Sequence, residues 1–374
     1  MQVAQAGFGV QVSGLETHLF EILDAILLTS RHPKPETRNP NLAVAVSGGA
    51  DSMALTLLAQ HWCEGHGIAL TAFTVDHGLR SESATEAAQV AAWLAARGIA
   101  HRILTPPSLP AIRNPQAQAR ARRYGALSNA CREIGSTHLL LAHHADDQAE
   151  TVALQRHRGE SPASHAGMAL VRAQGGIHLV RPLLGVRKSA LVNYLETHNQ
   201  PWVDDPSNAS DAYARNRLRR TMSETDFSTF WHEAQRAGVA RHHDEQMRND
   251  WLTTHATFAA GTLSLRLAPW AMLPEHQRTD VLSHAIRVIG AKSFRPRHHE
   301  TARLDAAIAA RAAGRATLGH CRIDWDRAQL MVQREPARAQ GLEAAPRAPH
   351  MTDASLWKLL VSEPFWWFNY PLAP

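Results

Sequence analysis

The stretch Ser47-Gly48-Gly49-Ala50-Asp51-Ser52 has the residue types of an anion-binding turn. It follows an apolar run, and the glycines permit a tight turn that leaves backbone N–H groups free at the start of a helix. These groups and the serine hydroxyls favour a phosphate. A carboxylate at Asp51 would repel a phosphate unless a divalent cation joined the two, so the pattern predicts a nucleotide with Mg²⁺. The alternative is an ordinary strand–turn–helix with a capping aspartate.

Two further polar groups follow strand-like runs. Asp76 and His77 follow the run 69–75, and a second group follows the run 137–142: His143, His144, Asp146, Asp147, Gln148 and Glu150. Because the carboxyl ends of parallel strands face the ligand crevice, we expect both groups near the nucleotide. The second group lacks histidines at i and i+4, so hard-oxygen chemistry with Mg²⁺ fits it better than a zinc site. For Asp76 and His77 the alternative is a capping aspartate and a surface histidine.

Positive charge gathers in two places. The stretch 113–132 holds five arginines, among them Arg120 and Arg123, and no acidic residue. A second basic run, Arg215-Asn216-Arg217-Leu218-Arg219, follows the turn-like Asp205-Pro206-Ser207-Asn208. An all-cationic helix is costly unless an anion lies against it, so both stretches favour a polyanionic partner. The alternative for each is a solvated basic face.

These residues need a scaffold that brings several strand ends together. From residue 42 to about residue 222, strand-like apolar runs alternate with helical patterns. This alternation predicts an α/β fold, with a Rossmann-like parallel sheet covered by helices on both faces. Helical patterns over 224–258, 276–290 and 297–313, followed by two short strand-like runs, predict a smaller, mainly helical C-terminal domain.

The composition divides the chain into four parts. We expect an N-terminal helix and linker over 1–39, the α/β domain over 40–222 and the C-terminal domain over 223–335. Residues 336–374 begin with an Ala/Pro-rich stretch and end in an aromatic tail, so we expect a flexible segment there.

The bulk composition limits the class of protein. The 374 residues carry a formal net charge of +5 and are 44% hydrophobic, which is ordinary for a globular protein. The three cysteines, Cys63, Cys131 and Cys321, form no C-x-x-C pair and indicate reduced thiols. No apolar run approaches the ~20 residues of a membrane span, and the first residues lack a secretory pattern. We therefore expect a cytoplasmic protein with no membrane partner.

Seven motifs in order resemble one family. The first, S-G-G-x-D-S, resembles the pyrophosphate loop (PP-loop) of the N-type ATP pyrophosphatases. It is followed by V-D-H-G-L-R, A-R-x-x-R-Y, A-H-H-x-D-D-Q-x-E-T, R-P-L-L-x-x-x-K, D-P-S-N and R-N-x-x-R, all between residues 47 and 219. This series resembles the catalytic domain of the tRNA(Ile)-lysidine synthase family. The resemblance is strong over 40–222 and looser over 224–335.

The resemblance implies a reaction. ATP would adenylate the 2-carbonyl oxygen of the wobble cytidine in a tRNA(Ile) with a CAU anticodon, and free L-lysine would then displace AMP. The product, lysidine, pairs with A in place of G, so codon reading changes from AUG to AUA. Residues 40–222 would form the PP-loop ATP pyrophosphatase domain, and 223–335 would contact the tRNA. The oligomeric state stays open.

The resemblance also implies roles for individual residues. ATP binding falls to Ser47, Gly48, Gly49, Ala50, Asp51, Ser52, Asp76 and His77, with Asp51 as the Mg²⁺ ligand. Catalytic roles fall to Asp51, Arg120, Arg123, His144 and Asp147, and tRNA binding to Arg215, Asn216, Arg217 and Arg219. Arg120 and Arg123 would stabilise the α-phosphate or hold the tRNA. His144 and Asp147 would bind the cytidine or the incoming amine.

The chain departs from the family pattern between residues 160 and 165, where Ser161, Ser164 and His165 replace Gly, Gly and Leu.

Two other functions stay open. A tRNA thiolase of the same superfamily would need catalytic cysteines or an iron–sulfur cluster, and a non-catalytic ATP- or RNA-binding module would release no pyrophosphate. A small-molecule synthetase would need a glutaminase or an ammonia route, and we find no glutaminase nucleophile motif.

Overall fold

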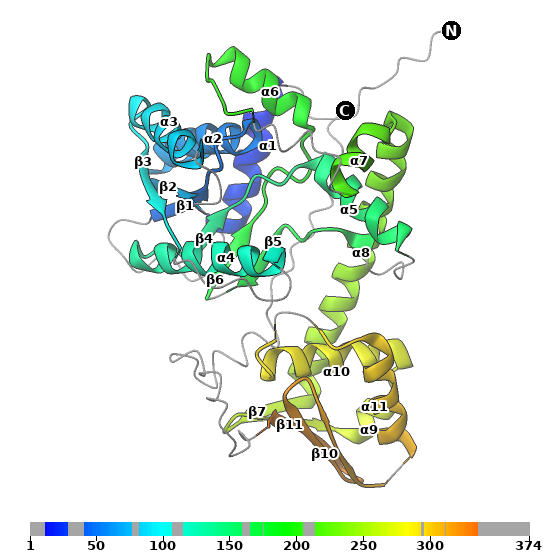
Figure 1. Cartoon of the computed structure of the whole chain (residues 1–374). Coiled ribbons are helices and arrows are strands. Elements are labelled where there is room, and N and C mark those ends of the chain that lie inside the picture. Colours follow the sequence, from blue (N-terminus) through cyan, green and yellow to red (C-terminus); the bar gives the residue numbers. More distant parts are fainter. Residues whose placement is uncertain are drawn as a thin grey trace. The chain divides into compact units, whose positions relative to one another are not determined.

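The computed structural model describes residues 12–28, 41–76, 82–106, 115–158, 165–174, 176–204, 214–292, 295–310 and 312–335 (Figure 1). The chain divides into two units between Ala240 and Arg241, inside helix α8. Within the described residues, no helix combines the length and the apolar character needed to cross a membrane.

The first unit alternates strands and helices. Its elements in chain order are α1 (Val12–Leu23), the π-helix η1 (Asp24–Leu28), β1 (Asn41–Ala45), α2 (Ala50–His66), β2 (Ala69–Val75), α3 (Glu82–Ala96), β3 (Ala100–Leu104), α4 (Pro115–Glu133), β4 (His138–Leu140), α5 (Ala145–His157), β5 (Val171–Gln174), β6 (Ile177–Val180), α6 (Lys188–Thr197), α7 (Ala214–Thr221) and the first part of α8 (Glu224–His255).

These strands form one six-stranded sheet in the order β3-β2-β1-β4-β6-β5. The first five are parallel, and β5 at the edge runs antiparallel to β6. The predicted α/β sheet is therefore confirmed, with an antiparallel edge strand that the sequence patterns did not reveal. The order of the strands along the chain reverses between β1 and β4, and ligands of such sheets bind outside the carboxyl ends of the strands at this point.

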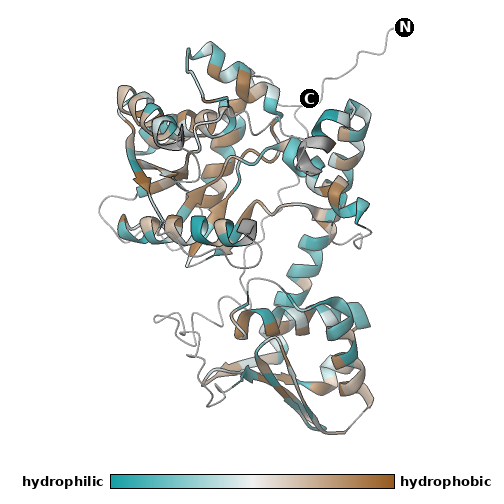
Figure 2. Cartoon of the chain, viewed as in Figure 1, coloured by the Kyte–Doolittle hydropathy of each residue, from teal (hydrophilic) through white to brown (hydrophobic). Residues whose placement is uncertain are grey.

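Two apolar cores sandwich this sheet. Along β1, Leu42 and Val44 pack with helices α1, α2 and α6, whereas Ala43 packs with α4 on the opposite face. This alternation follows from the two-residue period of a strand, and it explains why the central strands carry apolar residues on both faces of the sheet. Figure 2 shows the hydropathy of the residues along the chain. Helix α1, which the sequence places in the separate segment 1–39, contributes Leu15 and Leu19 to the first of these cores.

The second unit begins with the rest of α8. It continues with β7 (Ala256–Ala259), β8 (Thr262–Arg266), α9 (Leu267–Ala271), α10 (Glu275–Ile289), α11 (His298–Ala310), β9 (Gly314–Leu318), β10 (Cys321–Trp325) and β11 (Gln329–Arg334). The five strands form an antiparallel sheet in the order β7-β8-β11-β10-β9. The expected helices are present, and the sheet is larger than the two short strands that the alternating pattern indicated.

The boundary expected at residue 222 falls just before α8. The first turns of that helix pack with the first unit, because Phe227 and Trp231 share a small core with Ala145 and Ala149 of α5. Residues 336–374, including the aromatic tail, lie outside the described residues.

Candidate active site

The loop that follows β1 forms a tight turn into α2. The Oγ atom of Ser52 accepts a hydrogen bond from the backbone N–H of Ser47 at 3.2 Å and donates one to the carbonyl oxygen of Gly49 at 2.9 Å. Gly48 has a φ of +89°, and a Cβ atom there would lie 2.7 Å from Cγ2 of Val90. The turn therefore needs glycine at position 48 for two independent reasons, its backbone conformation and the lack of space.

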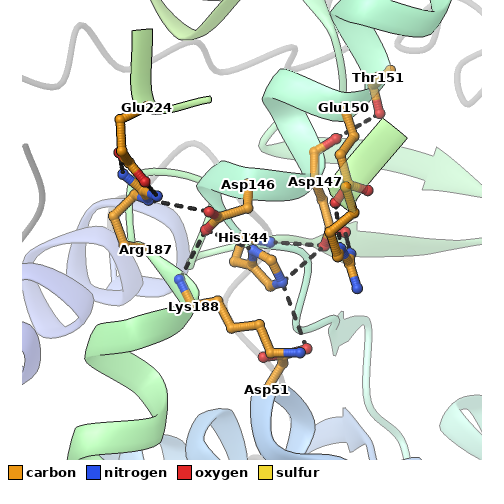
Figure 3. Close-up of polar contacts among 10 residues, drawn as sticks. Asp51, His144, Asp146, Asp147, Glu150, Thr151, Arg187, Lys188 and Glu224 are labelled. Carbon is orange, nitrogen blue, oxygen red and sulfur yellow. Dashed lines mark hydrogen bonds and ion pairs between the residues drawn. The ribbon is translucent and has the colours of Figure 1, made fainter. Parts of the chain in front are cut away.

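The loop after β4 brings His144 next to Asp51. Nε2 of His144 lies 3.5 Å from an Asp51 carboxylate oxygen and 3.6 Å from one of Asp147, and its Nδ1 lies 3.4 Å from one of Asp146 (Figure 3). The His144 side chain is 1% exposed. Burial alone would lower its pKa, but the three carboxylates outweigh burial and raise the pKa to about 10. His144 is therefore a cation at neutral pH.

Asp51 is also held in its charged form. Burial would raise the pKa of its carboxyl, but His144 and the positive charges of Lys188 and Arg219 lower it below the usual range. Figure 3 shows the Lys188 side chain extending from the start of α6 toward Asp51. The Oδ1 atom of Asp51 is buried and has no hydrogen-bond partner in the described structure. This oxygen atom is therefore available to a bound cation.

Arg187 and Lys188 fix the position of Asp146. The Asp146 carboxylate accepts a hydrogen bond from the backbone N–H of Lys188 at 2.9 Å and pairs with Nε of Arg187 at 3.1 Å. Arg187 also makes a two-point ion pair with Glu224 at the start of α8, at 2.9 and 3.0 Å. Its guanidinium carbon lies 3.7 Å from the ring centroid of Phe227. These contacts connect α5, α6 and α8 around His144.

Arg219 of α7 joins the same set of charges. Its guanidinium lies 2.6 Å from a carboxylate oxygen of Glu150 and 3.5 Å from one of Asp147. Glu150 is buried, with 1% of its surface exposed. Arg219 therefore lies beside the β4 loop rather than apart from it. The other basic residues of this run, Arg215 and Arg217, lie on α7 with Asn216, and their side chains are outside the described structure.

Asp76, Arg120 and Arg123 lie on other elements of the first unit than Asp51 and His144. Asp76 follows β2, and its backbone N–H donates to the carbonyl oxygen of Leu104 at 2.9 Å. His77 lies outside the described residues. Arg120 and Arg123 lie on α4, exposed, with their guanidinium carbons 5.0 and 5.8 Å from the ring centroid of Tyr124.

The structure adds Arg187, Lys188 and Glu224 to the predicted residues, whereas Asp146 and Glu150 were already expected near the nucleotide. Asp146 and Glu150 belong to the quoted A-H-H-x-D-D-Q-x-E-T motif, and Lys188 is the lysine of R-P-L-L-x-x-x-K. Their motif membership was the available signal. Arg187 and Glu224 carried no such signal, because their pairing depends on the approach of α6 and α8.

A Mg²⁺ ion fits the chemistry of Asp51. Mg²⁺ is usually held by one or two carboxylates together with substrate phosphates rather than by an all-protein cage. The buried Oδ1 atom without a partner provides one such oxygen. In the described part of the chain, no group of three or more His, Cys, Asp or Glu side chains is arranged to hold a metal ion on its own.

Known proteins match this chain over the same region. The PP-loop domain family matches residues 24–225, which include every residue of the site from Ser47 to Glu224. A tRNA(Ile)-lysidine synthase of Hyphomonas neptunium is 33% identical over 344 residues, covering 88% of each chain. The synthases of Ruegeria pomeroyi and of a Methylobacterium species are each 37% identical, covering 75% and 79% of this chain and 68% and 90% of their own lengths. With the PP-loop geometry, these matches show that the chain belongs to the tRNA(Ile)-lysidine synthase family.

Proposed function

We propose that this chain uses ATP to attach free L-lysine to carbon 2 of the wobble cytidine of a tRNA(Ile) with a CAU anticodon. The products are lysidine in the tRNA, AMP and pyrophosphate, so the protein is a ligase that forms a carbon–nitrogen bond. The observation that carries this proposal is the ion pair between Asp51 and His144, which brings the loops after β1 and β4 together in one charged site. The place of action is the cytoplasm, where the charged tRNA is used.

The loop from Ser47 to Ser52 would hold the pyrophosphate part of ATP. Its backbone N–H groups and the N-terminus of α2 favour negative charge, and the exposed Ser47 side chain adds a donor. A Mg²⁺ ion bound through Asp51 would neutralise charge on the leaving pyrophosphate. Asp76 would contribute from the neighbouring β2 end. Such positioning and charge neutralisation provide most of the catalysis in reactions of this class.

Because His144 is protonated, it and Asp147 would have different catalytic roles. A histidine that is already a cation cannot take a proton from the attacking amine, but it can stabilise negative charge on the α-phosphate or on the cytidine oxygen. Asp147 is acidic, adjacent and 15% exposed, so it is the better candidate to bind the lysine amine and accept its proton. Arg219 would hold Asp147 in place.

The cysteines argue against a thiolase. Cys63, Cys131 and Cys321 are all buried, and burial raises the pKa of each thiol to about 12. A thiol in that state is neither a nucleophile nor a ligand at neutral pH.

The chain departs from the family pattern at 160–165, and residues 160–164 of this segment lie outside the described structure. His165 pairs with Glu233 of α8 at 2.7 Å.

The test is AMP release from ATP by the purified full chain with Mg²⁺, L-lysine and CAU-anticodon tRNA(Ile), each omitted in turn. We expect AMP and lysine incorporation to depend on all of them and to be lost in Asp51→Ala. If AMP forms without lysine being incorporated, the ATP site stands and the proposed substrate is wrong. If no AMP forms under any combination, the chain is a binding module.

A further inference from the structure

Three arginines contact one buried tyrosine on the α4 face of the sheet, and the charge of a fourth acts on one of them. Tyr124 is 5% exposed, and Arg120 and Arg123 lie over its ring. Arg181 is hydrogen-bonded to Tyr124, and the charges of Arg172 and Arg120 act on Arg181. We name Arg120, Arg123, Arg172 and Arg181 the arginine cluster.

Arg181 is a buried cation whose hydrogen-bond partners are the Tyr124 side chain and a backbone carbonyl group. It is 3% exposed, and one terminal guanidinium nitrogen donates to the carbonyl oxygen of Ala169 at 2.7 Å. Its Nε atom has no hydrogen-bond partner, and no carboxylate of the described residues forms an ion pair with it. Burial and the neighbouring arginines lower its pKa to about 10. Buried charges are ordinarily paired, so this arrangement indicates a missing anion.

The other arginines near the active site are different. Arg187 and Arg219 each contact two carboxylates. Arg120 and Arg123, in contrast, lie over the Tyr124 ring and form no ion pair with a carboxylate of the described residues. Among the described residues, Arg120, Arg123 and Arg181 therefore lack the carboxylate partners that Arg187 and Arg219 have.

The fold places the cluster at the ligand edge of the sheet. Arg181 directly follows the carboxyl end of β6, and Arg120 to Tyr124 lie in the first half of α4, which starts after the carboxyl end of β3. Arg172 pairs in register with Leu179, whose side chain lies in the core on the α4 side. All four residues therefore lie on one face of the sheet, near the carboxyl ends of its parallel strands.

The order along that edge suggests what the anion is. The phosphate loop follows β1, His144 follows β4, and Arg181 follows β6, and these strands are neighbours in this order. Adjacent strands lie roughly 4.8 Å apart, so the ends of β1 and β6 are about 10 Å apart with the His144 centre between them. In the proposed reaction the base would react at the β4 end and the phosphates of ATP would lie on the β1 side, which leaves the β6 side for the backbone of the nucleotide.

We propose that the arginine cluster binds a backbone phosphate of the tRNA next to the cytidine that reacts. Arg120 and Arg123, which are exposed, supply direct donors, and Arg181 beneath them supplies a fixed positive charge. This inference rests on the proposed function and assigns Arg120 and Arg123 to the tRNA rather than to the α-phosphate of ATP.

The experiment measures binding of an anticodon stem–loop RNA to the full chain by fluorescence anisotropy. The phosphates on the 5′ and 3′ sides of the wobble cytidine are replaced in turn by an uncharged methylphosphonate. The protein variants are Arg120→Gln and Arg172→Gln, which avoid the buried position. Arg102→Gln is the matched control, since Arg102 also lies over an aromatic ring, Phe73, but pairs with Glu133.

We expect one of the two methylphosphonates to weaken binding to the wild type by about tenfold and to have little further effect on the cluster variants. The cluster variants should also reduce the slope of log affinity against log salt by about one, whereas Arg102→Gln should not. In steady state, KM for tRNA should rise with little change in KM for ATP.

Additive effects of methylphosphonate and arginine substitution would overturn the inference, as would a rise in KM for ATP with unchanged RNA binding. Thermal unfolding of each variant separates a folding defect from lost binding, and Arg120→Lys should restore part of the affinity. Failure of the proposed function is distinguishable, because then the wild type itself would form no lysidine.

Discussion

The Nε2 atom of His144 lies 3.5 Å from a carboxylate oxygen of Asp51, and each residue stands just beyond the carboxyl end of a different strand. The strands concerned, β1 and β4, are adjacent and parallel. The pair therefore forms at the point where the strand order reverses, and neither motif produces it alone. The charge on each partner supports the charge on the other, which keeps both ionised at neutral pH.

The first prediction concerns Asp51→Asn. The substitution keeps the side-chain volume but removes the negative charge that faces His144 and the proposed cation. We expect AMP formation to fall by about 10²–10³-fold, the loss that follows when one preorganised electrostatic contact is removed. Glu64→Gln, at an exposed position on the same helix, is the control and should retain full activity. Retention of more than a tenth of the activity by Asp51→Asn would contradict the assignment.

The second prediction compares two adjacent glycines. Gly48→Ala forces a positive φ on alanine and places its Cβ 2.7 Å from Val90 and 3.2 Å from Val203. We expect a loss of about 1–3 kcal/mol in the free energy of unfolding. In Gly49→Ala the nearest atom to the new Cβ is 3.8 Å away, so stability should change by less than about 0.5 kcal/mol. Urea unfolding of the full chain measures both, and equal losses would show that the turn is not strained.

The third prediction concerns Arg219→Ala, which leaves the buried Glu150 carboxylate without its ion pair. Because Arg219 is 38% exposed, we expect a moderate destabilisation of about 1–3 kcal/mol together with lower activity. Adding Glu150→Gln should restore most of the stability without restoring activity. Arg236→Ala, at an exposed position on α8, should leave stability nearly unchanged. If the double variant is no more stable than Arg219→Ala, the ion pair is not the cause of the loss.

The fourth prediction is a pH dependence in the second unit. Glu245 of α8 is buried, and its Oε2 atom has no hydrogen-bond partner in the described structure. Burial raises its pKa to about 7, although the charges of Arg241, Arg248 and Arg295 oppose this, and Asp280 adds to it. The folded state therefore holds a proton that the unfolded chain releases near pH 4.5, so this residue lowers stability as the pH rises from about 4.5 to 7.

Glu245→Gln removes this penalty. We expect the variant to be more stable than the wild type by about 1–3 kcal/mol at pH 8, with the difference shrinking toward pH 5. Thermal unfolding at the two pH values measures it. Asp244→Asn, at an exposed position on the same helix, serves as the control, and its stability relative to the wild type should not change in this way between pH 5 and pH 8. A variant that is less stable than the wild type at pH 8 would mean that the arginines need the Glu245 charge.

The sequence predicted the parts of the site that are local. The turn from Ser47 to Ser52 depends on glycine and on the preceding strand, and both are visible in the residue order. The antiparallel edge strand β5 is only four residues long, so its apolar period is too short to recognise.

The ion pairs around the site could not be predicted in the same way. Arg187 meets Glu224, and Arg219 meets Glu150, only because α6, α7 and α8 converge on α5. The sequence analysis assigned Arg219 to tRNA binding and did not foresee its ion pair, since its carboxylate partner lies on another helix. Tertiary packing decides which charges become neighbours, and a sequence pattern does not contain that information.

The burial of all three thiols has a consequence for the redox behaviour of the protein. With all three cysteines buried, thiol-directed oxidants and alkylating reagents would react slowly with the folded chain, and the charged residues that contact His144 are carboxylates. We therefore expect the catalytic chemistry of this site not to depend on the oxidation state of a thiol.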